Sequence, residues 1–561
     1  MKKMMDLLAE EMSAAFEKAG YDASLGKVTV SNRPDLCEYQ CNGAMAGAKT
    51  YHKAPLMIAE DVVKHLTESS VFSVAEAVKP GFINLKVRES FISHYLEQMK
   101  VSDSLGVEKT EDPKTIIIDY GGPNVAKPLH VGHLRSAIIG ESIKRMGRFM
   151  GHKVIGDVHL GDWGLQMGLI ITQLRDMKPD LPYFDDDFQG EYPKEAPFTI
   201  GELEEIYPAA SARSKEDEQF RQEALEATHL LQEGKPGYRA LWNHIMNVSV
   251  TDLKKNYEKL NVTFDLWKKE SDAQPYIPDM VEKMKQEGYA YLDQGALVVD
   301  VKEESDTKEI PPCMILKSDG ASLYTTTDLA TIVEREKLFH PDEILYVVDK
   351  RQEMHFIQVF RCAKKTGLLP DKTKLSFLGF GTMNGKDGKP FKTREGGVMR
   401  LEHLIADINE EMFKKIVENR SVRDKDAQET AQIVGLAAIK YGDLSNQATK
   451  DYILYTIVRI KSILNRYVEA GGNLESGEIL EASSDSEKAL MLALSGFSAM
   501  AVNAFEEKAP HKICSYIYEL ANEFNRFYHE TKILSEEDER QKESCIQLLN
   551  LAKRVLETSI D

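Results

Sequence analysis

The chain has 561 residues, of which 42% are hydrophobic and 29% are charged, and its net charge at pH 7 is −19. This length predicts about three domains, and the composition is that of a soluble globular protein. The negative charge argues against nonspecific binding of nucleic acid, although a local basic face can still bind RNA. No uninterrupted apolar run approaches the roughly 18 residues of a membrane-spanning helix, so no membrane association is expected.

Six cysteines are scattered along the chain without a CxxC pair. This spacing indicates neither a zinc site nor a disulfide framework, and we expect no protein-bound metal. Reduced thiols in the cytosol are the simplest explanation, so a cytoplasmic protein is expected. The N-terminal sequence MKKMMDLLAEEM indicates an amphipathic helix rather than a signal peptide.

The first part of the chain, residues 1–112, is predicted to form a small α+β domain. The pattern predicts helices over 2–19 and 54–66 and short strands over 27–31 and 81–87. A charged segment that contains a proline is expected to link this domain to the next one.

The most informative stretch follows this linker. The β-branched run of Ile116, Ile117 and Ile118 is typical of a buried parallel strand. Apolar residues then recur at helical spacing over 131–149. A strand, a glycine-containing loop and a helix in this order begin an open α/β nucleotide-binding fold. Ligands of that fold lie beyond the carboxyl ends of the strands, near a helix N-terminus that favours anions.

Two histidines, His130 and His133, flank Gly132 in an HxGH pattern at the start of this helix. Their spacing places both imidazoles on one side of the first turn, where each can donate an N–H to a phosphate. Gly132 lacks a Cβ, so a nucleotide can approach the backbone closely. Taken alone, the four-letter pattern is equally compatible with two histidines that cap a helix.

Further strands are predicted over 153–159, 295–301, 314–316 and 343–348. Because these strands alternate with helical patterns, they predict a mostly parallel sheet across 114–380.

Three other regions differ in composition. Residues 176–240 are acidic and rich in proline, and they indicate a helical insertion between the two halves of the nucleotide fold. Residues 379–397 form a loop rich in glycine and lysine, a composition that equally suits a mobile surface loop. From about 424 onward the pattern is helical, as in a plain bundle with an aromatic core.

The longer string PNVAKPLHVGHLRS resembles the arginyl-tRNA synthetases, a family of class I aminoacyl-tRNA synthetases. The strings DLCEYQCNGAM and GDWG share this resemblance. It implies a Rossmann-like parallel-sheet catalytic domain with a helical insertion, a small N-terminal α+β domain that contacts the tRNA elbow, and an all-helical anticodon-binding domain. The corresponding ranges are 1–112 for the N-terminal domain, 113–420 for the catalytic domain with its insertion near 176–290, and 421–561 for the anticodon-binding domain.

The resemblance also implies a two-step reaction. ATP and L-arginine give arginyl-adenylate and pyrophosphate, and the arginyl group then passes to the 3′ ribose of tRNA(Arg), releasing AMP. Two anions meet in the first step, so the protein must position them and neutralise charge, with Mg²⁺ carried by ATP. The residues expected to bind ATP are Pro123, Asn124, Val125, Ala126, Lys127, Pro128, Leu129, His130, Val131, Gly132 and His133.

The loop at 379–397 takes the place of the second class I signature, KMSK, but departs from it. The aligned residues read PFKT, so the first lysine of that signature is missing. As in several arginyl enzymes, upstream lysines are expected to substitute for it. The catalytic candidates are therefore Lys386 and Lys389, with Lys392 behind them, together with the two signature histidines.

By the same resemblance, arginine binds to Asp119, Asn124, His133, Tyr324, Asp328 and Gln352. Asp119 and Asp328 each lie near the end of a strand, and two acids can pair a guanidinium in bidentate fashion. Tyr324 could cover the plane of that guanidinium. Taken singly, each acid could also be a helix or loop cap.

Two alternatives stay open. The first is another HxGH enzyme. A cysteinyl-type synthetase would need a zinc-ligand cluster, which the sequence does not indicate, and a small nucleotidyltransferase would lack the helical C-terminal domain. The second is a catalytically silent paralogue that only binds tRNA. The intact histidines of the HxGH pattern argue against it, whereas the missing first lysine of KMSK is compatible with it. We expect a monomeric arginyl enzyme whose partners are tRNA(Arg), L-arginine and ATP.

Overall fold

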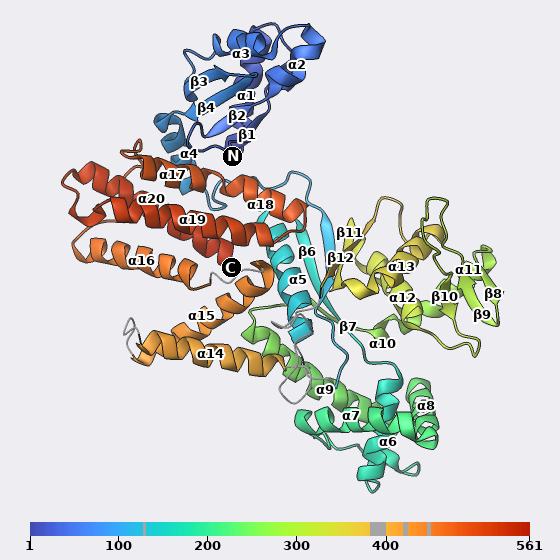
Figure 1. Cartoon of the computed structure of the whole chain (residues 1–561). Helices are drawn as coiled ribbons and strands as arrows, with labels where there is room; N and C mark the ends of the chain where they lie inside the picture. The colour runs from blue at the N-terminus through green and yellow to red at the C-terminus, as the bar shows by residue number, and fades with distance from the viewer. Residues whose placement is uncertain (127–128, 130, 382–399, 419–423, 446–449) are drawn as a thin grey trace. The chain divides into compact units, whose positions relative to one another are not determined.

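The computed structural model describes residues 1–561 except 127–128, 130, 382–399, 419–423 and 446–449 (Figure 1). The chain forms two compact units. The central unit comprises Glu111–Asp443, and the terminal unit combines Met1–Thr110 with Leu444–Asp561. The predicted domain limits at 112 and 420 stay predictions.

A five-stranded parallel sheet forms the centre of the central unit, as the sequence predicted. Its order is β12-β11-β5-β6-β7. The strands are β5 (Thr115–Tyr120), β6 (Lys153–Leu160), β7 (Leu266–Lys269), β11 (Glu343–Asp349) and β12 (Lys374–Phe380). Ile117 of β5 packs with Ile155 and Ile344 of the two neighbouring strands in one buried cluster.

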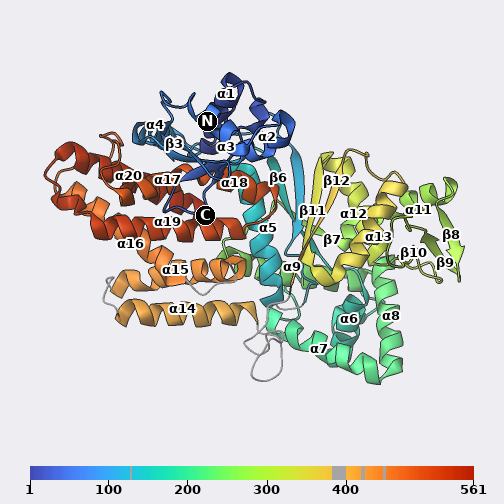
Figure 2. The ribbon, with the colours of Figure 1, turned by 45° about the horizontal axis from the view of Figure 1, so that its top comes forward.

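Helices cover both faces of this sheet. The helix predicted after the HxGH pattern is α5 (Val131–Phe149), which we call the signature helix. It lies on one face, while α12 (Tyr324–Phe339) and α13 (Glu353–Lys365) lie on the other (Figures 1 and 2). Because side chains alternate along a strand, Tyr120 faces α5 and Asp119 faces α12.

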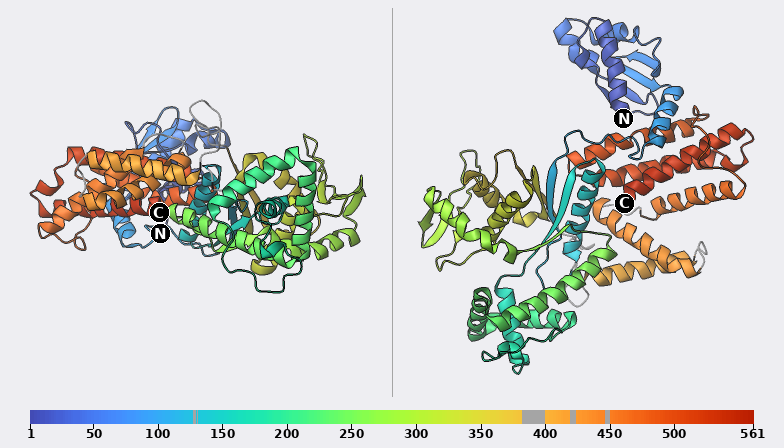
Figure 3. Two further views of the ribbon diagram at one scale, coloured as in Figure 1. Left: turned by 90° about the horizontal axis from the view of Figure 1, so that it is seen from below. Right: turned by 180° about the vertical axis from the view of Figure 1, so that it is seen from behind.

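The helical insertion follows β6. It consists of α6 (Leu165–Met177), α7 (Ile200–Glu216), α8 (Glu218–Glu233) and α9 (Pro236–Lys259). Thr199 and Glu202 form a capping box at the start of α7, and Gly234 ends α8 in the left-handed conformation. The long helix α9 brings the chain back to the central sheet, which it rejoins at β7 (Figure 3).

The strands predicted over 295–301 and 314–316 are not part of the parallel sheet. They are β9 (Ala296–Val299) and β10 (Cys313–Leu316), which join β8 (Ala290–Asp293) in a separate antiparallel sheet. Gln294 and Gly295 both have positive φ, so they form the tight hairpin turn that separates β8 from β9. The inner face packs on α11 (Ile277–Gln286) and on α12. A short helix, α10 (Glu270–Ala273), precedes this region.

The N-terminal part of the terminal unit is the predicted α+β domain. Its antiparallel sheet has the order β1-β2-β4-β3, with β1 (Val28–Val30), β2 (Tyr39–Cys41), β3 (Phe72–Val78) and β4 (Phe82–Val87). Its helices are α1 (Met4–Lys18), α2 (Gly43–Tyr51), α3 (Pro55–Val63) and α4 (Glu89–Val101). All six cysteines of the chain are free and buried.

The C-terminal part is all helical. It contains α16 (Lys450–Glu469), α17 (Asp485–Ser495), α18 (Phe497–Glu506), α19 (His511–Glu530) and α20 (Glu539–Ile560), and it is preceded by α14 (Leu401–Glu418) and α15 (Asp424–Ser445). Residues 485–506 are apolar and long enough to pass a length-and-composition test for a membrane span. However, this stretch breaks at Gly496 between α17 and α18, and half of it is buried within the protein. A core role explains it as well.

Candidate active site

The loop that follows β5 is held from two sides. The Gly121 N–H donates to Ser136 Oγ on α5 (2.8 Å), and the Ser136 hydroxyl donates to a carbonyl of β11 (2.6 Å). From α9, the Tyr257 hydroxyl donates to Gly121 O, and Ser249 Oγ accepts the N–H of Ala126 (3.0 Å). The last helix of the insertion, α9, therefore helps to fix this loop between β5 and α5, which we call the signature loop.

Two glycines let this loop approach the end of β6. A Cβ on Gly122 would lie only 2.2 Å from the carbonyl oxygen of His159, and one on Gly161 would lie 2.1 Å from Asn124 Oδ1. Asn124 and Gly161 form a parallel β-bridge. The segment that leads into the HxGH pattern, which is the first class I signature, is thus in direct contact with the GDWG segment, although many residues separate the two in the sequence.

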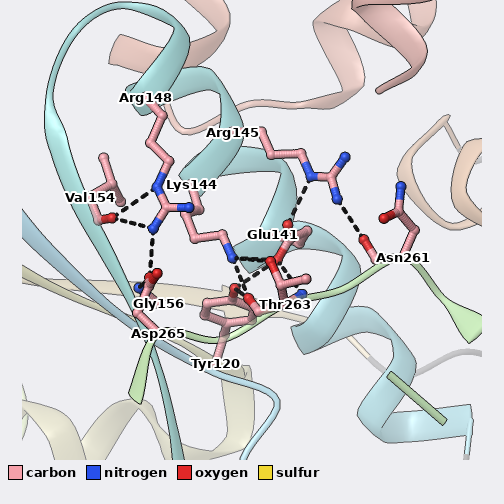
Figure 4. Close-up of polar contacts among 10 residues, drawn as sticks. All are labelled: Tyr120, Glu141, Lys144, Arg145, Arg148, Val154, Gly156, Asn261, Thr263 and Asp265. Atoms are coloured by element: carbon pink, nitrogen blue, oxygen red, sulfur yellow. Dashed lines mark hydrogen bonds and ion pairs between the residues drawn. The ribbon is translucent and has the colours of Figure 1, made fainter. Parts of the chain in front are cut away.

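A buried network anchors the signature helix to the chain that returns from the insertion (Figure 4). Glu141 and Lys144 of α5 form an ion pair (2.8 Å) with almost no solvent exposure. The Tyr120 hydroxyl donates to Glu141 (2.8 Å), and the Lys144 ammonium donates to Thr263 Oγ1 (3.0 Å). Burial lowers the pKa of Lys144 below its usual value despite the neighbouring carboxylate. This network fixes the position and rotation of α5, and with them the first turn that carries His133.

Both ends of the lysine-rich loop lie beside the first signature. Arg135, on the first turns of α5, donates to the carbonyl of Gly381 (2.7 Å). At the other end, the N–H of Leu401 donates to the carbonyl of Leu129 (2.8 Å). Residues 382–399 are outside the described chain, but their flanking residues are attached to the two sides of the signature.

Acidic side chains gather where β5, β6 and β7 end. We define the acidic cluster as Asp119, Asp157, Asp162, Glu270 and Asp328. Within it, the almost fully buried Arg335 of α12 donates to Asp119 Oδ2 (2.6 Å) and to Asp157 Oδ2 (2.7 Å). The guanidinium also lies 5.4 Å from the centre of the Tyr346 ring. Asp119 therefore already has a guanidinium partner within the chain.

Asp328 lies at the opposite end of the cluster. It is on α12, two turns before Arg335 and on the same helix face, since seven residues make about two turns. The imidazole of His355, on the first turn of α13, contacts Asp328 (Nε2–Oδ2 2.5 Å). Tyr324 begins α12 and is 66% exposed, and Gln352 is exposed just before α13. Tyr324 and Asp328 therefore share one helix face, since they are four residues apart. The expected position of Asp328 near the end of a strand is wrong, because it lies within α12 and the preceding strand β10 ends at Leu316.

Comparisons with known proteins agree with this geometry. A family model described as the catalytic domain of class I (R) tRNA synthetases matches residues 95–455. The arginyl tRNA synthetase N terminal domain matches 3–87, and the DALR anticodon binding domain matches 453–561. The chain belongs to the arginyl-tRNA synthetase family.

Relatives cover the chain from end to end. The arginine–tRNA ligase of Agathobacter rectalis is 61% identical over 100% of this chain and 98% of its own length. That of Alkaliphilus oremlandii is 56% identical, with 99% and 98% covered. Among solved structures, the arginyl-tRNA synthetases of Plasmodium falciparum (TM-score 0.81, 23% identity) and Thermus thermophilus (0.76, 21%) cover all of this chain and 98% of theirs. At these identities, the two structures show the shared fold.

The structure describes only part of the segment that is expected to bind ATP. Pro123, Asn124, Val125, Ala126 and Leu129 form the loop described above, and His133 lies in the first turn of α5. Six expected site residues lie outside the described residues: the catalytic candidates His130, Lys386, Lys389 and Lys392, and the ATP-binding candidates Lys127 and Pro128. The side chains of Val131 and Gly132 are also not described. Their assigned roles stay predictions.

Sequence reasoning missed Glu270, the first residue of α10. Burial raises the pKa of its carboxyl to about 8, and the nearby Asp162 and Asp328 add to the shift. Asp162 is fixed by Ser271, whose N–H and hydroxyl donate to it (3.0 and 2.6 Å). Its position directly after a strand of the parallel sheet would have indicated it. That strand, β7, is short, and the sequence pattern did not predict it.

Several buried polar atoms near the acidic cluster have no hydrogen-bond partner among the described residues. They are Nδ1 and Nε2 of His159, Oδ1 of Asp157 and Nη1 of Arg335. Buried polar atoms in proteins are normally satisfied by protein groups, ordered water or ligand.

Proposed function

We propose that this chain is an arginine–tRNA ligase. It activates L-arginine with ATP to give arginyl-adenylate and pyrophosphate, and then transfers the arginyl group to the 3′ ribose of tRNA(Arg), releasing AMP. The observation that carries the proposal is the acidic cluster beside the signature loop, at the strand ends where ligands of this fold bind. The membership of the chain in the arginyl-tRNA synthetase family supports the same reaction.

The guanidinium of the substrate binds between Glu270 and Asp328. These two carboxylates lie within electrostatic reach of each other, and Tyr324 lies within reach of both. A guanidinium presents five donors in a rigid fork. A competitor without that fork leaves these two partly buried carboxylates without a guanidinium partner, so arginine is favoured over other amino acids.

Asp119 contributes charge at the other end of the cluster. A single guanidinium, that of Arg335, serves both Asp119 and Asp157, so it can neutralise only one of them. Asp119, together with Asn124 and His133, then receives the α-ammonium and carboxylate end of the substrate. Gln352 completes the arginine site from the start of α13.

Activation needs no protein nucleophile. The carboxylate of bound arginine attacks the α-phosphorus of ATP, a bond forms between this oxygen and phosphorus, and pyrophosphate leaves. The chain supplies positioning and positive charge, through His130, His133, the N-terminus of α5 and a lysine of the 382–399 loop. The attachment of Gly381 and Leu401 beside the first signature supports this role of the loop.

The remaining assignments complete the proposal. ATP brings Mg²⁺ on its phosphates; among the described residues, no group of three or more His, Cys, Asp or Glu is placed to hold a metal ion. The N-terminal α+β domain and the C-terminal helical domain bind tRNA(Arg). The enzyme acts as a monomer in the cytoplasm, without a membrane.

The test is ATP–pyrophosphate exchange with each of the twenty amino acids, with and without total tRNA. The expected result is exchange with arginine alone. Exchange with another amino acid would show a different specificity, and binding of tRNA without any exchange or aminoacylation would identify a silent paralogue.

A further inference from the structure

His355 connects two elements at the acidic cluster. Its Nε2 lies 2.5 Å from Oδ2 of Asp328, so α13 contacts α12 through this pair. Both side chains are about one quarter exposed, at 27% and 26%. A contact this short between an imidazole and a carboxylate is a charge-assisted hydrogen bond.

The position of the imidazole is itself fixed by the core. Its ring lies edge-on to Phe356, with ring centres 5.1 Å apart and an angle of 81° between the planes. Phe356 packs in the buried cluster with Ile117 and Ile344 of the central sheet. The donor that meets Asp328 therefore belongs to the residue just before an aromatic side chain that packs on the central sheet.

Asp328 offers a second oxygen. In the described part of the chain, His355 is the one group that hydrogen-bonds to its carboxylate, and it contacts Oδ2. Rotation about the terminal bond of an aspartate is broad, so a carboxylate without a partner samples many orientations. A fixed donor on one oxygen removes this freedom before the ligand arrives, which favours binding.

We propose that His355 is a positioning residue for arginine recognition: it holds Oδ2 of Asp328, so that Oδ1 faces the guanidinium of the substrate. The inference rests on the proposed function, because it assigns Asp328 to the arginine site. His355 itself acts through Asp328 and does not touch the reacting atoms.

The test compares two substitutions at this position in the full-length enzyme, using aminoacylation of total tRNA. Gln places an amide N–H close to the position of Nε2, whereas Leu fills similar space without a donor. His355→Leu is expected to raise the KM for arginine about 10-fold or more, the usual effect of losing a hydrogen bond to a charged group. The kcat and the KM for ATP stay within about 3-fold, and His355→Gln restores most of the arginine KM.

The chain offers a matched control on the same helix. His340, at the end of α12, pairs with Glu336 (Nδ1–Oε1 3.2 Å) and its side chain is 78% exposed. His340→Leu removes a similar histidine–carboxylate contact at the exposed end of α12, between two residues that are not part of the acidic cluster. We expect it to leave the arginine KM unchanged.

A double-mutant cycle separates this inference from the proposed function. In an Asp328→Asn background, His355→Leu should have no further effect on the arginine KM, because the two residues act as one unit. If His355→Leu does not fold, His355→Asn replaces it, since its shorter amide cannot reach Oδ2.

Three results would overturn the role of His355. They are equal arginine KM values for the Leu and Gln variants, a rise of the ATP KM alongside the arginine KM, or full additivity in the cycle. By contrast, an unchanged arginine KM in Asp328→Asn alone would remove Asp328 from the arginine site, and with it the pocket in the proposed function.

Discussion

Glu270 is mostly protonated near neutral pH in the free protein, because burial, Asp162 and Asp328 raise its pKa to about 8. A guanidinium beside it would favour the ionised form and lower that pKa. Binding of arginine below pH 8 therefore releases a proton from Glu270. The same argument makes affinity increase with pH up to about 8 and level off above it, once the free carboxyl is already ionised.

Calorimetry of arginine binding at pH 7, in buffers with different ionisation enthalpies, measures this release directly. Close to one proton should leave per arginine bound, and the number should fall towards zero above pH 8. Glu270→Gln should abolish the release. A release that persists in the Gln variant would assign the proton to another group.

Glu270→Gln also tests the arginine site by kinetics. It keeps the shape of the protonated side chain but cannot become charged, so the KM for arginine should rise about 10-fold or more. The KM for ATP should change little, because the proposed site places Glu270 at the guanidinium end of the substrate. Asp119→Asn is the variant to compare with Glu270→Gln. Asp119 lies at the other end of the acidic cluster, where Arg335 already donates a hydrogen bond to one of its oxygens. Equal effects on both substrates would argue against this site.

At the scale of elements, the signature helix depends on a buried ion pair. Lys144→Met removes the buried one of the two cations that contact Glu141 and leaves this nearly buried carboxylate beside Tyr120 with the partly exposed Arg145. The loss of one partner of a buried pair should destabilise the central unit by about 3 kcal/mol or more. Thermal unfolding followed by calorimetry measures this change.

Arg145→Met is the matched control, because Arg145 contacts the same Glu141 (2.8 Å) but keeps 29% side-chain exposure. Its loss should cost no more than about 1 kcal/mol. If both variants unfold at the same temperature, burial of Lys144 contributes nothing to the position of α5.

At the scale of the whole molecule, the two ends of the chain form one unit. Lys488 of α17 is nearly buried and bridges Glu38 (2.8 Å) and Glu89 (3.0 Å) of the N-terminal domain. Although burial opposes its charge, these two carboxylates raise the pKa of Lys488 above its usual value. Arg554 of α20 adds a hydrogen bond to the carbonyl of Ser102 (3.0 Å).

Lys488→Ala should therefore loosen the N-terminal domain from the helical bundle. Hydrogen exchange in α4, which packs on α17, should become faster, because two carboxylates lose their shared cation. Lys542→Ala is the control: Lys542 is about as buried, at 16% side-chain exposure, but it pairs with Glu539 of its own helix. Unchanged exchange in α4 would show that other contacts hold the domains together.

Local patterns in the sequence determined the family and much of the architecture. The run Ile116–Ile118 and the helix after it depend on residue period, which is readable within a few positions, whereas the strings PNVAKPLHVGHLRS and GDWG carried the resemblance to the family. Residue periodicity correctly predicted β5, α5, β6 and the parallel sheet. The pattern over 295–301 and 314–316 showed strands but not their pairing partners, so the antiparallel sheet was missed.

Only the tertiary structure decided which charged groups meet. Asp119 and Arg335 are 216 residues apart in sequence, and no local pattern shows that this arginine pairs with a residue expected to bind the substrate. Likewise, the packing of α10, α12 and α13 at the strand ends brings Glu270 and His355 to Asp328. Spacing fixes which face of an element a residue occupies, whereas burial and long-range contacts fix its charge partner and its pKa.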